Sequence, residues 1–184
     1  MRTLIMLAPA LIAAIPGAAL AQASSSSTKS VGVVGTAPAM CFGGTLTGTG
    51  AYDLGVLIDT ATGQLRTDLT APAKILVGSF CTGRSTITVN ATPLAAQNST
   101  VAPPTGFSRE IDYVATASGW TATPAAFNTA IPANSAATQT RASAFTGDIT
   151  VAISGFATSG GNALRLVADD NYRGLVTVTI AAVN

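Results

Sequence analysis

The chain has 184 residues, of which 48% are hydrophobic and only 9% are charged, with a formal net charge of +1. This composition supports one hydrophobic core and excludes a large disordered protein or one that captures nucleic acid through clustered basic side chains. The absence of histidine removes the usual general base of hydrolases and the most common zinc ligand, and two cysteines are too few for a thiolate zinc site or an iron–sulfur cluster. We therefore expect a protein that is not an enzyme and that holds no metal and no cofactor.

The first 23 residues have the layout of a secretory signal peptide. Arg2 supplies a positive start, residues 4–20 are uncharged and apolar, and small residues offer cleavage after Ala21 or Ala23. Prolines interrupt the apolar run, which disfavours a transmembrane anchor. We expect an exported chain with no stable membrane anchor after cleavage.

Residues 24–36 are predicted to be a flexible extension, and residues 37–184 a single domain. Serines 24–27 begin a polar tract with no apolar periodicity, so it cannot contribute to a core. Cleavage after Ala23 would remove Arg2 and leave eight basic and eight acidic side chains, which gives no support for binding to nucleic acid or anionic lipid.

The rest of the chain is rich in Thr, Val, Ile and Ala, with turn residues about every eight to twelve positions, which is typical of an all-β sandwich or barrel. Residues 119–146 contain Pro124 and Pro132, and we expect an extended crossing loop there with one edge strand. In chain order, the predicted strands cover residues 42–47, 52–58, 64–69, 74–81, 86–89, 110–115, 148–153, 164–168 and 174–181.

Alternating apolar residues predict which side of each strand faces the core. The last strand is the clearest example, since Val176, Val178 and Ile180 alternate with Thr177 and Thr179. The other sets expected to point inward are Ile75, Val77 and Cys81; Ile87 and Val89; Ile149, Val151 and Ile153; and Leu164, Leu166 and Ala168.

Cys41 and Cys81 are predicted to form a structural disulfide, because an even number of cysteines in an exported chain favours a bridge. Closing a loop of about forty residues stabilises a fold by roughly 4 kcal/mol in the chain-entropy model. No third cysteine, histidine or Cys-x-x-Cys arrangement is present to make a redox site. The alternative is a pair of buried free thiols.

Two places could still carry chemistry or a ligand. Asp169 and Asp170 are adjacent, but neighbouring strand residues point to opposite faces, so we interpret them as a solvated turn, with calcium binding together with Asn171 or a hydrolase site as alternatives. Trp120 is the one tryptophan, and it is expected to pack in the core or at its rim. Its alternative role is a platform for a sugar.

The layout of the chain resembles the subunits of chaperone–usher pili and the related spore coat U-like secreted proteins. The resemblance rests on the signal peptide, the extension around residues 30–35, the spacing of Cys41 and Cys81, and the closing segment 172–180. The chain ends in Ala182-Val183-Asn184, whereas typical pilins carry a penultimate tyrosine.

The resemblance implies an immunoglobulin-like antiparallel β-sandwich that lacks one strand. It also implies assembly by strand addition, in which the extension of one subunit fills a groove in the next. The donor would be residues 31–36, with Val31 and Val33 as plugs and Gly35 at a close backbone approach. The acceptor edge would be Val176, Val178 and Ile180.

The function implied by the resemblance is that of a structural subunit of a fimbria or coat at the cell surface, with a role in adhesion or biofilm. Its partners would be copies of itself or homologous subunits, a periplasmic chaperone and an outer-membrane usher. The alternative interpretation is a complete sandwich in which residues 31–36 are an ordinary first strand. That protein would be a secreted module that binds a glycan or a protein through loops near Trp120 and Pro103-Pro104.

Overall fold

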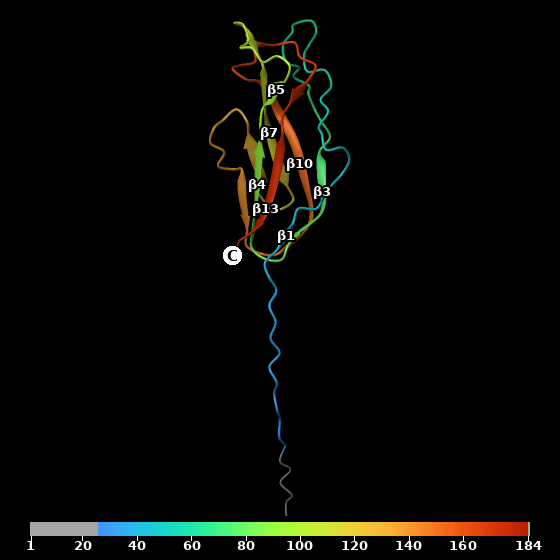
Figure 1. The fold of residues 1–184 in the computed structure, drawn as a ribbon, viewed down its shortest axis with the longest axis vertical. Helices are drawn as coiled ribbons and strands as arrows, with labels where there is room; N and C mark the ends of the chain where they lie inside the picture. The colour runs from blue at the N-terminus through green and yellow to red at the C-terminus, as the bar shows by residue number, and fades with distance from the viewer. Residues whose placement is uncertain (1–25, 184) are drawn as a thin grey trace, which may run out of the picture. The chain divides into compact units, whose positions relative to one another are not determined.

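The structure is a computed structural model that describes residues 26–183, and the chain divides after Thr36 into two units. The predicted signal peptide lies outside the described residues. Residues 26–36 form neither strand nor helix (Figure 1). The side chains of Val31, Val33 and Val34 are 88%, 96% and 96% exposed.

Between residues 37 and 183 the chain forms strands and no helix, which confirms the all-β prediction (Figure 1). The strands are β1 (Cys41–Phe42), β2 (Thr45–Leu46), β3 (Lys74–Cys81), β4 (Ser85–Ala91), β5 (Leu94–Ala96), β6 (Phe107–Ser108), β7 (Glu110–Ser118), β8 (Ala125–Asn128), β9 (Thr138–Arg141), β10 (Phe145–Thr158), β11 (Arg165–Leu166), β12 (Tyr172–Arg173) and β13 (Val176–Ala182).

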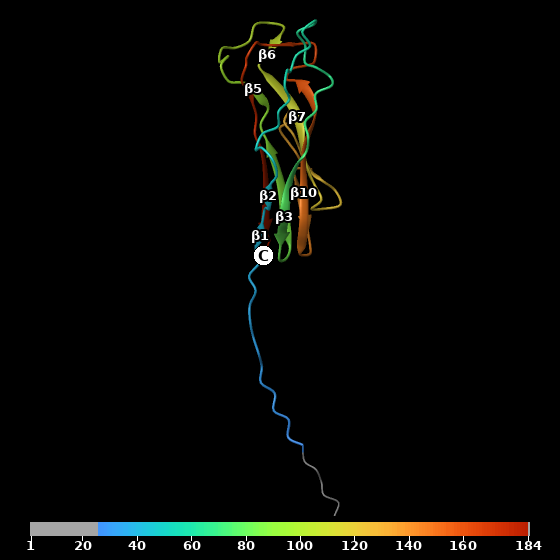
Figure 2. The same cartoon turned by 90° about the vertical axis from the view of Figure 1, so that its right-hand side faces the viewer.

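Two antiparallel sheets form the two layers of the domain. The larger has the order β1-β3-β10-β7-β5-β12, with β2 also paired to β3 and β8 also paired to β7. The smaller has the order β13-β4-β9, and a separate short pair, β11 and β6, is parallel. The C-terminal end of β13 lies close to β1 in both views (Figures 1 and 2).

The core lies between these two sheets. Ile87 and Val89 from β4 pack in one cluster with Ile149 and Val151 from β10, as their alternating patterns predicted. Ile87, Val89 and Ile149 are 0% exposed. Full burial of such side chains contributes about 1.5–3 kcal/mol each relative to exposure.

The inward face predicted for β3 is correct at Cys81 but wrong at Ile75 and Val77. Leu76, Ser79 and Cys81 face the core, whereas Ile75 and Val77 are 37% and 43% exposed. The register with β10 shifts between the pairs Gly147↔Ser79 and Ile149↔Leu76, so two residues of β3 oppose one of β10. Such a bulge breaks the period of two, and Gly78 supplies the positive φ of 71° within it.

Other predicted strands are shorter or absent. Segments 52–58 and 64–69 form only the isolated bridges Ile58↔Leu65 and Gln64↔Arg165. Asp53 Oδ1 accepts the backbone N–H of Gly55 at 2.9 Å, and this turn interrupts the extended backbone. Segment 164–168 contains only β11, and Ala168 is exposed rather than inward-facing. Segment 119–146 contains both β8 and β9, where one edge strand was predicted.

Candidate functional site

β13 has a hydrogen-bonded strand on one edge only within the described residues, because it pairs with β4 and ends the smaller sheet. Next to β13, the backbone N–H of Val183 donates to the carbonyl of Arg84 at 2.9 Å. Alternate residues of an antiparallel strand bond to the same neighbour. The backbone groups of Val176, Val178 and Ile180 therefore point away from β4, toward the unpaired edge.

β1 and β2 form a second edge, since both pair with β3 alone in the described part of the chain. The N–H of Thr82 donates to the carbonyl of Met40 at 2.9 Å, and the N–H of Thr47 donates to the carbonyl of Ile75 at 2.9 Å. By the same alternation, the backbone groups of Leu46 point away from β3.

A hollow of about 190 Å³ lies between these two edges. Leu46 on β2 lines it together with Leu76, Val151, Val176 and Val178. Two further hollows of about 500 and 690 Å³ adjoin it and share Tyr52 as a lining residue with it. We call the two hollows that β13 lines, of about 190 and 500 Å³, the apolar groove, although Lys74, Asp170 and Arg173 also line them.

The core side chains of β4 are fully buried, whereas those of β13 are only partly covered. Val176, Val178 and Ile180 pack against the core cluster but remain half-buried, whereas Ile87 and Val89 on the neighbouring strand are 0% exposed. A strand placed along the free edge of β13 would remove these three apolar side chains from water and give partners to the free backbone groups.

The three tyrosines of the chain, Tyr52, Tyr113 and Tyr172, line the hollow of about 500 Å³. Each hydroxyl donates to a backbone carbonyl: Tyr52 to Val151 at 2.7 Å, Tyr113 to Leu175 at 3.3 Å and Tyr172 to Val167 at 2.9 Å. Burial raises the pKa of all three, and that of Tyr113 reaches about 12 because the charge of Tyr52 adds to the effect of burial. These hydroxyls stay neutral near pH 7 and serve as fixed donors in the groove wall.

The predicted disulfide is confirmed. Cys41 and Cys81 are bonded and lie directly opposite each other on β1 and β3, with their Cα atoms 4.1 Å apart. The bridge fastens β1, one edge of the groove, to the body of the larger sheet.

The donor residues predicted at Val31, Val33 and Gly35 lie in the first unit. The valines are almost fully exposed, and no atom lies within 4 Å of the position that a Cβ would take on Gly35. The segment therefore carries uncovered apolar side chains.

Trp120 cannot be a sugar platform in this fold, which corrects the alternative prediction for this residue. Its side chain is 0% exposed and packs on Phe145 with ring centroids 4.2 Å apart. The guanidinium of Arg141 donates to the backbone carbonyl of Trp120 at 2.7 Å and lies over the ring of Phe145. Trp120 is a core residue.

Asp169 is a structural acceptor. Its carboxylate accepts the backbone N–H groups of Asn98, Ser99 and Asn171, each at 2.8 Å. Desolvation alone would raise the pKa of Asp169, but these N–H donors outweigh it and hold the pKa below its usual value. The turn before β12 is thereby tied to the loop after β5. Residues 26–183 hold no group of three or more potential metal ligands.

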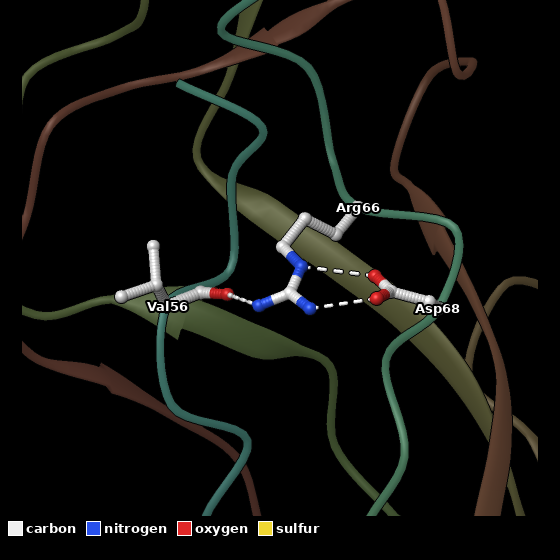
Figure 3. Close-up of polar contacts among 3 residues, drawn as sticks. All are labelled: Val56, Arg66 and Asp68. Atoms are coloured by element: carbon white, nitrogen blue, oxygen red, sulfur yellow. Dashed lines mark hydrogen bonds and ion pairs between the residues drawn. The ribbon is translucent and has the colours of Figure 1, made fainter. Parts of the chain in front are cut away.

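A separate hollow of about 560 Å³ belongs to the loop between residues 56 and 68. Arg66 donates to both carboxylate oxygens of Asp68, at 2.9 and 2.7 Å, and to the carbonyl of Val56 at 3.4 Å (Figure 3). The hydrogen bond with Asp68 raises the pKa of Arg66 and lowers that of Asp68. Both side chains are exposed, and such surface pairs organise a loop with little gain in stability.

Known proteins add no assignment to this geometry, since no family model, curated protein or solved structure matches the chain. No helix among residues 26–183 is long and apolar enough to cross a membrane.

The sequence alone did not indicate most of the groove wall. Leu46, Tyr52, Leu76 and Tyr113 come from distant parts of the chain and meet only through the sheet topology. The rarity of tyrosine could have marked part of this wall, because the chain has only 5% aromatic residues and all three tyrosines line the groove.

Proposed function

We propose that the chain is an exported structural subunit that assembles by strand addition. The observation that carries this proposal is the unpaired edge of β13 beside the apolar groove. Exposed sheet edges next to apolar surface are natural templates for a strand from another chain. In this interpretation the domain is an immunoglobulin-like sandwich that lacks one strand.

The strand that fills the groove is residues 31–36 of another copy. Val31 and Val33 alternate with smaller or outward-pointing residues, so both would enter the groove while Gly35 allows a close approach of the backbones. Each valine is almost fully exposed in the single chain, so its insertion would bury the full side chain. A homologous subunit with the same pattern would fit equally well.

The assembled product would be a fibre or a coat at the cell surface, with adhesion or biofilm formation as its outcome. After export, a periplasmic chaperone would cover the groove until an outer-membrane usher exchanges it for the strand of the next subunit. These two partners are what the resemblance to chaperone–usher subunits implies, and the open groove supports a covering partner, because an uncovered edge of this kind aggregates.

The test is an unboiled denaturing gel of the mature chain, run without reductant. Strand-linked polymers are kinetically trapped, so the wild type should give a ladder that collapses to a monomer on boiling. The double variant Val31→Asp, Val33→Asp should lose at least about nine-tenths of the ladder, because a buried unpaired carboxylate is strongly disfavoured.

The matched control is Val34→Asp, which adds the same charge to an equally exposed valine on the opposite face of an extended strand. It should keep the ladder. A ladder that survives the double substitution, or one lost equally in both variants, would refute donation by residues 31–36.

A further inference from the structure

Residues 57–66 form a hairpin whose shape is fixed by hydrogen bonds. The N–H of Asp59 donates to the carbonyl of Gln64 at 2.9 Å, which closes the hairpin turn. Nε of Arg165, on β11, donates to the carbonyl of Thr62 at 3.1 Å. The turn is therefore fastened to the body of the domain.

Arg66 follows this turn and is also held in place. Its guanidinium donates to both carboxylate oxygens of Asp68 and to the carbonyl of Val56 (Figure 3). A guanidinium fork on a carboxylate has a defined geometry, and Asp68 compensates the charge of Arg66. We call the hollow of about 560 Å³ that these residues line the Arg66 hollow.

The Arg66 hollow is separate from the apolar groove. The two share no lining residue. Both views show the teal loop of residues 56–68 at the end of the domain away from the C-terminal end of β13 (Figures 1 and 2). A strand along β13 would therefore leave this hollow uncovered, and the volume of the hollow lies within the range of about 300–1,000 Å³ that ligand sites occupy.

Polar groups that line the Arg66 hollow remain available to a ligand. Within residues 26–183, the side-chain amide of Gln64 makes no hydrogen bond, although this residue is half-buried. Asp59 accepts the N–H of Ala61 with Oδ1 at 2.8 Å, which leaves Oδ2 available. A carboxylate oxygen accepts, whereas an amide both donates and accepts, so the two side chains together match hydroxyl groups. A partly buried amide gains from such a partner.

The rest of the lining adds apolar surface and a negative charge. Ile58 and Leu65 are half-buried and pair directly as an isolated bridge. Among the described lining residues, Arg66 is the only basic one, and Asp68 already compensates it, so the carboxylate of Asp59 leaves the hollow with a net negative charge. A ligand with hydroxyl groups and C–H faces but without a negative charge fits this combination.

We propose that the Arg66 hollow binds a neutral hexose unit, with Gln64 and Asp59 bonding its hydroxyls and the surface of Ile58 and Leu65 covering its C–H face. The inference is independent of strand addition, so the gel test of the ladder can fail without affecting it. Within the proposed function it gives adhesion a ligand class, because a hollow that stays uncovered on each subunit is repeated along a fibre and binds multivalently.

The test is a titration of the folded mature chain, labelled with nitrogen-15, with glucose, galactose and mannose in turn. Amide chemical shifts report both the affinity and the residues that respond. The variants are Gln64→Ala, Asp59→Asn and Arg66→Lys. Gln139→Ala is the matched control, since Gln139 is also half-buried but lies on β9, outside the hollow. The uronic acid of the sugar that binds tests the charge argument.

One or more of the three sugars should shift the amides of residues 58–66 in a saturable way. Gln64→Ala and Asp59→Asn should each raise the Kd at least about fivefold, since each removes a hydrogen-bonding group. Arg66→Lys should raise it at least about threefold, because an ammonium group does not reproduce the fork on a carboxylate. Gln139→Ala should leave it within about twofold. The uronic acid should bind at least about fivefold more weakly than its hexose, because its carboxylate meets that of Asp59.

Four results would each overturn the proposal. Absence of a saturable response to all three sugars would show that the hollow binds no neutral hexose. Responses confined to residues outside 56–68, or an equal loss of affinity in Gln139→Ala and Gln64→Ala, would place the binding elsewhere. A uronic acid that binds as tightly as its hexose would contradict the charge argument. A variant that unfolds is recognised by its collapsed amide dispersion, and the other two variants then decide.

Discussion

Tyr113 links the closed core to the open groove. Its side chain is 3% exposed, and its hydroxyl donates to the carbonyl of Leu175, just before β13. Burial, assisted by the charge of Tyr52, raises its pKa from 10.0 to about 12. A tyrosine with a raised pKa in the folded state favours folding below its unfolded pKa, and this contribution is lost as the pH rises through the folded value.

The free energy of unfolding should therefore fall between pH 10.0 and about pH 12. In Tyr113→Phe the loss from about pH 8 to about pH 11 should be smaller by about 1 kcal/mol, since one pKa unit corresponds to about 1.4 kcal/mol. Urea unfolding of both proteins across this range measures the difference. Tyr52 and Tyr172 keep part of the alkaline loss in the variant, because their pKa values are raised too. Equal losses in the two proteins would contradict the assignment.

At the scale of elements, the turn between β1 and β2 depends on one glycine. Gly44 has a φ of 74°, and a Cβ there would lie 2.6 Å from Ser79 Oγ and 2.7 Å from the carbonyl oxygen of Val77. Both the backbone conformation and the contact with β3 exclude a side chain. This turn fixes the groove edge formed by β1 and β2.

Gly44→Ala should lower the free energy of unfolding of the mature chain by about 2 kcal/mol or more, since a left-handed conformation alone costs about 1–2 kcal/mol outside glycine. Gly43→Ala is the matched control, because no atom lies within 4 Å of its Cβ position. Its effect should stay within about 0.5 kcal/mol. Urea unfolding measures both, and equal effects would show that the turn tolerates a side chain.

Strand prediction from sequence succeeded where one alternating pattern ran without interruption. The patterns of β4 and β13 gave the correct inward residues, and the two cysteines gave the disulfide. The prediction for β3 was wrong at Ile75 and Val77 because the bulge at Gly78 reverses the alternation, and its cause is the register with β10. A contact between distant strands leaves no periodic signal in either one.

Of the candidate site, the sequence predicted only the part that β13 contributes. The alternation in β13 marked Val176, Val178 and Ile180, but whether an edge stays unpaired depends on the whole sheet order. The burial of Trp120 was equally a matter of tertiary packing, since Arg141 and Phe145 come from the later strands β9 and β10. Short sequence windows therefore identified the groove strand and missed most of the groove wall.

At the scale of the whole molecule, assembly should depend on apolar burial rather than on charge. Residues 31–36 carry no charge, and the mature chain cleaved after Ala23 has equal numbers of acidic and basic side chains. In the groove, Leu46, Leu76 and Val178 offer apolar surface, and Lys74, the charged side chain that lines the same hollow, meets no charge in residues 31–36. Association without electrostatic steering is governed by contacts that salt does not screen.

The rate of ladder formation should therefore change by less than about twofold between about 0.05 and 0.5 M sodium chloride, although the Debye length falls from about 14 to about 4 Å over that range. Sodium sulfate should accelerate assembly, because it strengthens apolar burial. Lys29 is the only charged residue in segment 24–36, so Lys29→Gln is the control and should leave both responses unchanged. A rate that falls tenfold in sodium chloride, and loses this dependence in Lys29→Gln, would instead assign the recognition step to an ion pair at Lys29.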